Sequence, residues 1–450
     1  MNADNLLSTE HRSLNPGVRR REVLGWAMYD FANSGYTTVV LTAVFSAYFV
    51  GAVAGGADWA TLAWTTTLSV SYLITLLTAP SMGAWADAYA AKKRLLAMVT
   101  VLCVLATAGL ALVQPGDVAL GVALIIVSNV AYSWGESTSY AFLPELAKPE
   151  AMGKVSGWGW GLGYAGGMLT LGLCLAWVLS AQAREEPASA FVPVTMLITA
   201  AMYGAAALVT FALLREHAKP DPLAMQRDGF QASLLRLRHT WQHAREYRDF
   251  MWLQLCAVCY QGGVAVAVAL SAVYAEQVIG FKTQETMFLI FALNGAAMVG
   301  ALLFGYWQDR VGHKLALGVT LVGWALTCWL AATSETKGEF WVAAAIAGVC
   351  MGTSQSAGRA MAGLLAPPQR LAEFYGLWGV ATRLASIIGP MLYGLVNWVT
   401  QGDHRSSILS TMALFVVALL ALLPLNMQRG REAALRAASD SAASRVAVQA

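Results

Sequence analysis

The chain has 450 residues, of which 57% are hydrophobic and only 12% are charged. Soluble globular domains carry about 25% charged residues, so a single water-surrounded core is excluded and the lipid bilayer is the expected solvent. The formal net charge is only +3, and no dense face of Lys and Arg indicates binding to nucleic acid.

The first segment, residues 1–23, is polar and ends in three arginines, which predicts a tail that is not cleaved. A helix needs about 20 mostly apolar residues to cross the hydrocarbon core. Twelve such runs follow, at 24–50, 59–82, 95–113, 118–142, 156–180, 189–214, 250–279, 284–305, 315–333, 339–366, 374–400 and 405–427. The predicted fold is therefore an all-α membrane protein with twelve transmembrane helices.

Lys and Arg are distributed unevenly among the loops between these runs. The tails and every second loop hold most of them, for example Lys92, Lys93, Arg94, Lys148, Lys154, Arg236, Arg238, Arg310, Lys314 and Arg429. Positive loops remain on the cytoplasmic side. The pattern predicts a multi-pass protein of the cell membrane with both termini in the cytoplasm.

The longest non-membrane segment, 215–249, is predicted to be a cytoplasmic linker that contains an amphipathic helix from Phe230 onward. The tail at 428–450 is rich in Ala, Ser and Arg and is predicted to be disordered. His239 and His243 lie four residues apart, and Cys256 and Cys259 have Cys-x-x-Cys spacing. A solvated helix face and small apolar residues explain these pairs better than metal ligands, so no metal and no cofactor are predicted.

A repeat divides the chain into two predicted six-helix bundles, 24–214 and 250–427. Gly83-Ala-Trp-Ala-Asp87 follows the second run, and Gly305-Tyr-Trp-Gln-Asp309 follows the eighth. Each is followed by basic residues, among them Arg94 and Arg310. Parallel repeats of this kind place a substrate site near the midplane, where the two halves meet. We expect the matched Asp87 and Asp309, together with the basic residues Arg94 and Arg310, to take part in gating.

These two loops resemble the signature loop of the major facilitator superfamily, although Ala90 and Ala91 stand where a glycine is common. Residues 26–34, Trp-Ala-Met-Tyr-Asp-Phe-Ala-Asn-Ser, resemble the first-helix motif of the vacuole-effluxer-like branch, which is related to autophagy-linked amino-acid effluxers of yeast. Residues 141–147 and the glycine-rich segment behind them are similar to that branch too. The resemblance implies two pseudo-symmetric bundles of the major facilitator fold, alternating access and, in fungal relatives, release of amino acids.

Four charged residues interrupt the apolar runs: Asp30, Glu136, Arg359 and Arg383. A buried charge costs about 2.5–3.5 kcal/mol on insertion scales, so these side chains are expected to have a task. The repeat places Glu136 and Arg359 at similar depth in opposite halves, where we expect them to pair. Asp30 or Glu136 is the predicted protonatable coupling group.

The predicted substrate-binding residues join these charges to nearby polar and aromatic side chains. Arg383 is the preferred anion-recognition residue and Arg359 the second, because a guanidinium binds carboxylate through two hydrogen bonds. Tyr29, Asn33 and Tyr36 of the first run share one helix face and are further candidates. The remaining candidates, in other runs, are Gln261, Asn294, Trp134 and Trp378.

The sequence therefore predicts a monomeric secondary active transporter of a small polar solute, an amino acid or a related organic anion or zwitterion, with efflux as the candidate direction and protons as the candidate coupling ion. The main alternative is a non-transporting solute sensor on a transporter scaffold. An enzyme is not predicted, because all six histidines lie in loops or tails and no phosphate-binding P-loop is present.

Overall fold

The computed structural model describes residues 13–218 and 247–449 of the chain. Twelve helices within these ranges are long and apolar enough to cross a membrane. Many of their large apolar side chains are exposed, including Leu77, Leu208 and Leu303 at 57%, 72% and 65%. Such surfaces are stable in lipid rather than in water, so the predicted all-helical membrane fold is confirmed.

Six spans form the first bundle, which we call the N bundle. The first span is interrupted: α2 (Arg20–Tyr36) continues as the π-helix η1 (Thr37–Ala43), then α3 (Phe45–Tyr48) and η2 (Phe49–Val53). The others are α4 (Ala60–Ala88), α5 (Lys92–Gly109) with η3 (Leu110–Leu112), α6 (Val118–Tyr140), α8 (Met152–Gln182) and α9 (Ala188–Leu213). The short helices α7 (Leu143–Leu146) and η4 (Pro149–Ala151) join α6 to α8.

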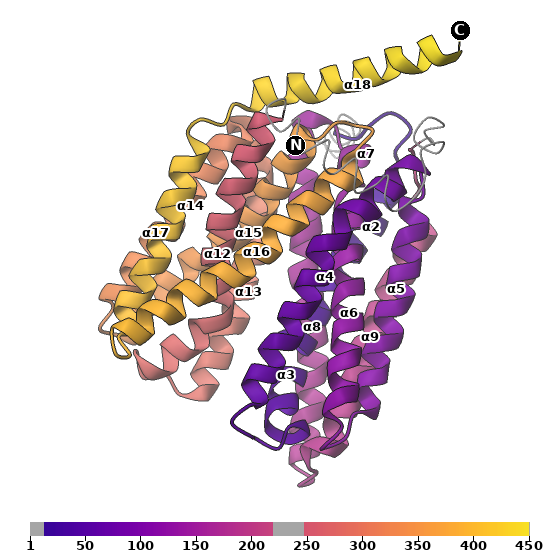
Figure 1. Cartoon of the computed structure of the whole chain (residues 1–450). Coiled ribbons are helices and arrows are strands. Elements are labelled where there is room, and N and C mark those ends of the chain that lie inside the picture. Colours follow the sequence, from indigo (N-terminus) through magenta and orange to yellow (C-terminus); the bar gives the residue numbers. More distant parts are fainter. Residues whose placement is uncertain (1–12, 219–246, 450) are drawn as a thin grey trace, which may run out of the picture.

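The other six spans form the second bundle, which we call the C bundle and which repeats the helix order of the N bundle. They are α12 (Arg248–Gln277), α13 (Thr283–Val311), α14 (His313–Thr333), α15 (Lys337–Leu365), α16 (Leu371–Val399) and α17 (His404–Leu422). The two bundles lie side by side and diverge away from α18 (Figure 1). Their main contacts are α8 with α13 and α4 with α16.

The start of α2 and the last helix, α18 (Met427–Gln449), lie at the same end of the molecule (Figure 1). We call this end the terminal face and the opposite end the distal face. The helical tail corrects the prediction of disorder after residue 427. Arg429 anchors α18 through Asp249, with its Nη2 atom 2.7 Å from Oδ1 of that carboxylate. The predicted linker helix and its histidines lie in 219–246, outside the described residues.

Candidate functional site

A cavity of about 330 Å³ lies between the bundles. The N bundle contributes hydroxyl-bearing residues of the first span together with Trp160 and Tyr164 of α8. The C bundle contributes a mainly apolar wall, which includes Val264, Leu293 and Phe415. The cavity therefore has one side rich in hydroxyl groups and one mainly apolar side with a few polar groups, among them Asn294 and Gln355, which suits a small solute with polar and apolar parts.

The polar side is built where the first span changes from α-helix to π-helix. Ser34, Thr37, Thr38 and Thr42 line the cavity there. Thr38 donates its hydroxyl hydrogen to the Ser34 carbonyl at 2.8 Å, and Thr42 donates to the Thr37 carbonyl at 3.0 Å. These hydroxyl donors are satisfied within the helix. The oxygen lone pairs therefore remain to accept hydrogen bonds from a solute.

An ion pair between the bundles lies beyond the terminal end of the cavity. Asp30 is one helical turn from Ser34, and Arg359 is one turn from Gln355, another cavity residue. The Arg359 Nη1 atom donates to Asp30 Oδ2 at 2.6 Å. Arg359 also donates to the Ser156 hydroxyl at 3.0 Å and to the Ser156 carbonyl at 2.6 Å. Asp30 and Ser156 belong to the N bundle, so this buried contact joins the two bundles.

Aromatic rings enclose the guanidinium of Arg359. Its central carbon lies 4.7 Å from the ring centroid of Trp26 and 4.8 Å from that of Tyr140. The ring faces attract the cation and exclude water. The charges of Asp30 and Arg359 therefore neutralise each other, and the rings shield them from water, which explains how both side chains can be almost fully buried.

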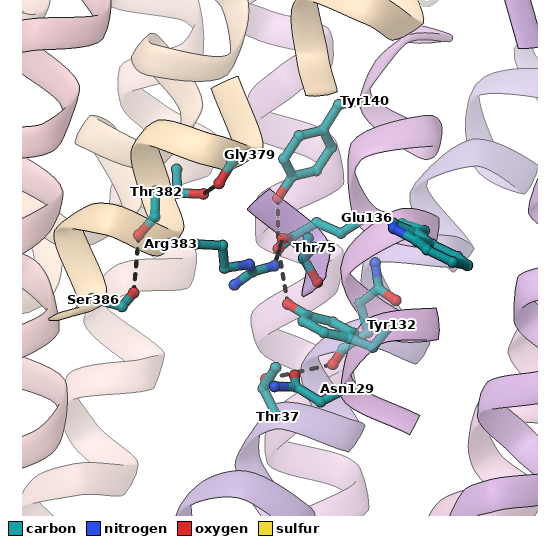
Figure 2. Close-up of polar contacts among 12 residues, drawn as sticks. Thr37, Thr75, Asn129, Tyr132, Glu136, Tyr140, Gly379, Thr382, Arg383 and Ser386 are labelled. Carbon is teal, nitrogen blue, oxygen red and sulfur yellow. Dashed lines mark hydrogen bonds and ion pairs between the residues drawn. The ribbon is translucent and has the colours of Figure 1, made fainter. Parts of the chain in front are cut away.

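A second ion pair between the bundles joins Arg383 of α16 to Glu136 of α6 (Figure 2). The Arg383 Nη2 atom is 2.5 Å from Glu136 Oε2. Tyr132 and Tyr140 donate to the other oxygen of Glu136, at 2.8 and 3.2 Å. The guanidinium also lies 5.6 Å from the ring centroid of Tyr72. In both pairs the N bundle supplies the carboxylate and the C bundle supplies the arginine.

This arrangement corrects the predicted partnership of Glu136 with Arg359. The repeat placed these residues in opposite halves correctly, but Arg359 binds Asp30 and Glu136 binds Arg383. Similar depth along two helices does not fix which faces meet. Packing of α15 against α8 turns Arg359 toward Ser156 and Asp30 instead.

The repeated loops close the terminal face at two matched seams. Asp87, at the end of α4, accepts the backbone N–H of Glu373 in the first turn of α16 at 3.0 Å. Asp309, at the end of α13, accepts the N–H groups of Gly153 and Lys154 in the first turn of α8 at 2.8 and 2.9 Å. Each carboxylate satisfies free amides at the positive end of a helix dipole in the opposite bundle.

Glycine allows the helices to approach closely at both seams. A Cβ atom on Gly83 would collide with the Ala372 carbonyl of α16, and one on Gly157 would collide with the Ala301 carbonyl of α13. The basic partner of Asp87 is Lys92, 3.6 Å away, which also binds Glu145. The predicted gating residues Arg94 and Arg310 are exposed instead.

Comparison with known proteins agrees with this architecture. Residues 56–435 match the family model described as "Vacuole effluxer Atg22 like". The chain belongs to the Atg22-like vacuole effluxer family. An uncharacterized MFS-type transporter of Bacillus subtilis, YxiO, is 28% identical over 402 residues, which are 88% of this chain and 93% of YxiO. Autophagy-related protein 22 of Eremothecium gossypii is 21% identical over 364 residues, covering 73% and 69% of the two chains.

Solved structures show the same fold. The human organic anion transporter MFSD10 superposes with a TM-score of 0.66 at 15% identity and covers 90% of this chain and 99% of its own. A bacterial homologue of the iron transporter ferroportin, in its outward-facing state, superposes with a TM-score of 0.68 at 15% identity, over 90% of this chain and 99% of the homologue. This Atg22-like protein is therefore a transporter of the major facilitator type.

The remaining predicted substrate residues of this Atg22-like transporter are divided between the cavity and the bundle interiors. Asn294 lines the cavity. Gln261 exchanges hydrogen bonds with the cavity residue Gln355 at 2.8 and 3.0 Å. Trp134 donates to Thr78 within the N bundle at 3.0 Å, and Trp378 is buried.

The predicted face of α2 turns away from the cavity. The Tyr203 hydroxyl donates to Asn33 Oδ1 at 2.8 Å and lies 3.2 Å from the Tyr29 hydroxyl, and the Tyr36 hydroxyl lies 2.8 Å from the Ser128 hydroxyl. All these residues lie inside the N bundle. Tyr29, Asn33 and Tyr36 do share a face, as predicted, but that face packs against α6 and α9.

The sequence interpretation missed most of the cavity lining, including Ser34, Thr37, Thr38, Thr42, Trp160, Tyr164 and Gln355. The spacing of the hydroxyl residues at 34, 38 and 42 was an available signal, because residues four apart lie on one helix face. Aromatic residues in a glycine-rich helix carry no comparable pattern. Within the described ranges, no group of three or more His, Cys, Asp or Glu side chains is arranged to hold a metal ion.

Proposed function

We propose that the protein exports an amino acid or a related small zwitterion or organic anion across the cell membrane, coupled to protons, by alternating access. The observation that carries this proposal is a cavity with two ion pairs between the bundles near its terminal end. Alternating access requires a cavity that can hold the solute and, on one side of it, contacts between the bundles that can break and re-form.

The proposed orientation places the terminal face in the cytoplasm. Lys92, Lys93, Arg94, Lys154, Arg310, Lys314 and Arg429 belong to this face, whereas the distal loops carry Arg184, Lys282, Lys337 and Arg405. The positive-inside rule supports this assignment. The structure then represents a conformation that is closed toward the cytoplasm.

Replacement of the ion pair between Glu136 and Arg383 by contacts with the solute supports a substrate that carries both a positive and a negative charge. Opening of the terminal face separates Glu136 from Arg383, and each would then bury an unpaired charge at high cost. A solute carboxylate can bind Arg383 through two hydrogen bonds, while a solute ammonium group can bind Glu136. Protonation of Glu136 is the second way to neutralise it, which links transport to protons. The family description as effluxers supports the direction.

Counterflow in proteoliposomes tests whether the protein is a carrier. Purified protein is reconstituted with an unlabelled amino acid inside, and uptake of the labelled amino acid is followed for a panel of amino acids and organic anions. A carrier gives uptake that is stimulated by the internal solute. A sensor binds the solute, as seen in a thermal shift, without stimulated uptake, and that result would refute the transport proposal.

Glu136→Gln tests proton coupling. The neutral amide retains the hydrogen-bonding shape but cannot exchange a proton. We expect transport driven by a pH gradient to fall at least tenfold while counterflow persists. Glu335→Gln, an exposed residue on the distal side, is the matched control and should behave as wild type. Unchanged dependence on the gradient would remove Glu136 as the coupling group.

A further inference from the structure

A second hollow of about 420 Å³ lies between α2, α8 and α13, close to the terminal face. Its walls are almost entirely apolar and include Val23 and Ala27 of α2, Leu162 and Ala165 of α8, and Leu302 of α13. Leu24, at the same site, is 52% exposed on the outer surface. This groove is separate from the central cavity, with which it shares no lining residue.

Positive charge is concentrated at one end of the groove. Arg20, in the first turn of α2, is a lining residue, and the exposed Arg19 and Arg21 adjoin it in sequence. The ammonium group of Lys154 lies 5.5 Å from the ring centroid of Trp158, which also lines the groove. From Arg20 to Ala27 the groove follows α2 for about 10 Å, at 1.5 Å per residue.

We propose that this groove binds one anionic phospholipid of the leaflet at the terminal face. The acyl chain lies along the apolar walls, and the phosphate lies at Arg20, where the span leaves the hydrocarbon core. An apolar slot with a cationic end at the depth of the headgroups matches the chemistry of such a lipid. A soluble anion would not need the apolar walls, and an uncharged lipid would not need the arginine.

The groove has walls from both bundles, so the lipid favours the conformation closed at the terminal face. Gly161 and Leu302 form the narrow boundary: a Cβ atom on Gly161 would lie 2.7 Å from Leu302 Cδ2. The Trp158 indole N–H donates to the Tyr306 hydroxyl across the same seam at 3.1 Å. Separation of α8 from α13 would open this boundary and divide the groove. This second step rests on the proposed alternating access, whereas lipid binding does not.

Native mass spectrometry of the purified full-length protein tests the binding. The probes are phosphatidylglycerol and phosphatidylcholine with the same acyl chains, added to delipidated protein. Wild type should retain phosphatidylglycerol at least fivefold better than phosphatidylcholine. Arg20→Gln should abolish this preference, and Ala165→Phe should reduce retention of both lipids by filling the groove. The adjacent Arg21→Gln is the matched control and should retain the wild-type preference.

Three results would overturn the lipid site: no preference in wild type, an equal loss in Arg21→Gln, or full retention in Arg20→Gln. Thermal unfolding in detergent identifies a misfolded variant. Arg20→Gln changes an exposed side chain, so it tests lipid binding even if Ala165→Phe does not fold. Hydrogen exchange then tests the conformational step in nanodiscs. Phosphatidylglycerol should slow exchange at the terminal ends of α8 and α13 at least threefold in wild type but not in Arg20→Gln.

Equal exchange in both lipids would refute the conformational step and leave the binding result intact. Failure of the transport proposal is seen separately, as absent counterflow in proteoliposomes of either lipid composition. The two proposals therefore fail in different measurements.

Discussion

At the scale of single residues, the main feature is the separation of opposite charges between the bundles. Asp30 and Glu136 belong to the N bundle, and Arg359 and Arg383 to the C bundle. A buried pair of this kind contributes little net stability, but loss of one partner leaves the other charge uncompensated. These contacts therefore hold the bundles together in one conformation and oppose their separation.

Asp30→Asn should destabilise the protein by about 3–5 kcal/mol, because the buried Arg359 loses its counter-charge. The double variant Asp30→Asn/Arg359→Gln should recover part of this loss. Thermal unfolding in detergent of wild type, both single variants and the double variant gives the coupling free energy. Additive effects in the four proteins would mean that the two side chains are not energetically coupled.

Ala90 supplies a second prediction at this scale. It lies between α4 and α5 with φ at +48°, in the left-handed region that costs a non-glycine residue roughly 1–2 kcal/mol. Glycine is common here in the signature loop that this segment resembles. Ala90→Gly should raise the unfolding temperature, because it relieves about 1 kcal/mol of backbone strain. Ala91→Gly is the control and should not raise it, because Ala91 has a negative φ of −118°. A lower unfolding temperature for Ala90→Gly would show that the conformation is not strained.

At the scale of elements, each seam joins the end of one helix to the beginning of another. Asp87 and Asp309 cap α16 and α8, and glycines permit the backbones to meet. The caps contribute only while the bundles are closed at the terminal face. Their loss should therefore change the conformational equilibrium more than the stability of either bundle.

Asp309→Ala should shift the equilibrium away from the closed terminal face by about 1 kcal/mol, roughly fivefold in population, as expected for an N-cap. Faster hydrogen exchange at the first turn of α8 is the measurement. Asp403→Ala, which removes the cap of α17 on the distal side, is the control. An equal increase at α8 in both variants would contradict a specific role for Asp309.

Gly83→Ala tests the closeness of the seam between α4 and α16. The added methyl group would collide with the Ala372 carbonyl, so the terminal face should close incompletely and counterflow should fall at least fivefold. Gly172→Ala in α8 is the matched control, because its Cβ would meet nothing within 4 Å. Wild-type counterflow in Gly83→Ala would show that this contact is not needed for the transport cycle.

At the scale of the whole molecule, two similar bundles enclose a cavity with one polar and one apolar side. The bundles lie closest together toward the terminal face and diverge toward the distal face (Figure 1), and they are joined by the two seams and by the two ion pairs, of which Figure 2 shows Glu136 with Arg383. A rocking motion of the bundles would have to break these contacts together and form others at the distal face. The proposed alternating access follows from this uneven distribution of contacts.

The sequence by itself determined the twelve spans, the repeat and the four intramembrane charges, because hydropathy and helix length are local properties of the chain. It also determined that Tyr29, Asn33 and Tyr36 share a face. Only the tertiary structure decided that this face is internal, that Ser34 and Thr38 meet the cavity, and that Arg359 binds Asp30. Helical periodicity fixes neighbours within one helix, but rotation and partner choice depend on packing between helices that are distant in sequence.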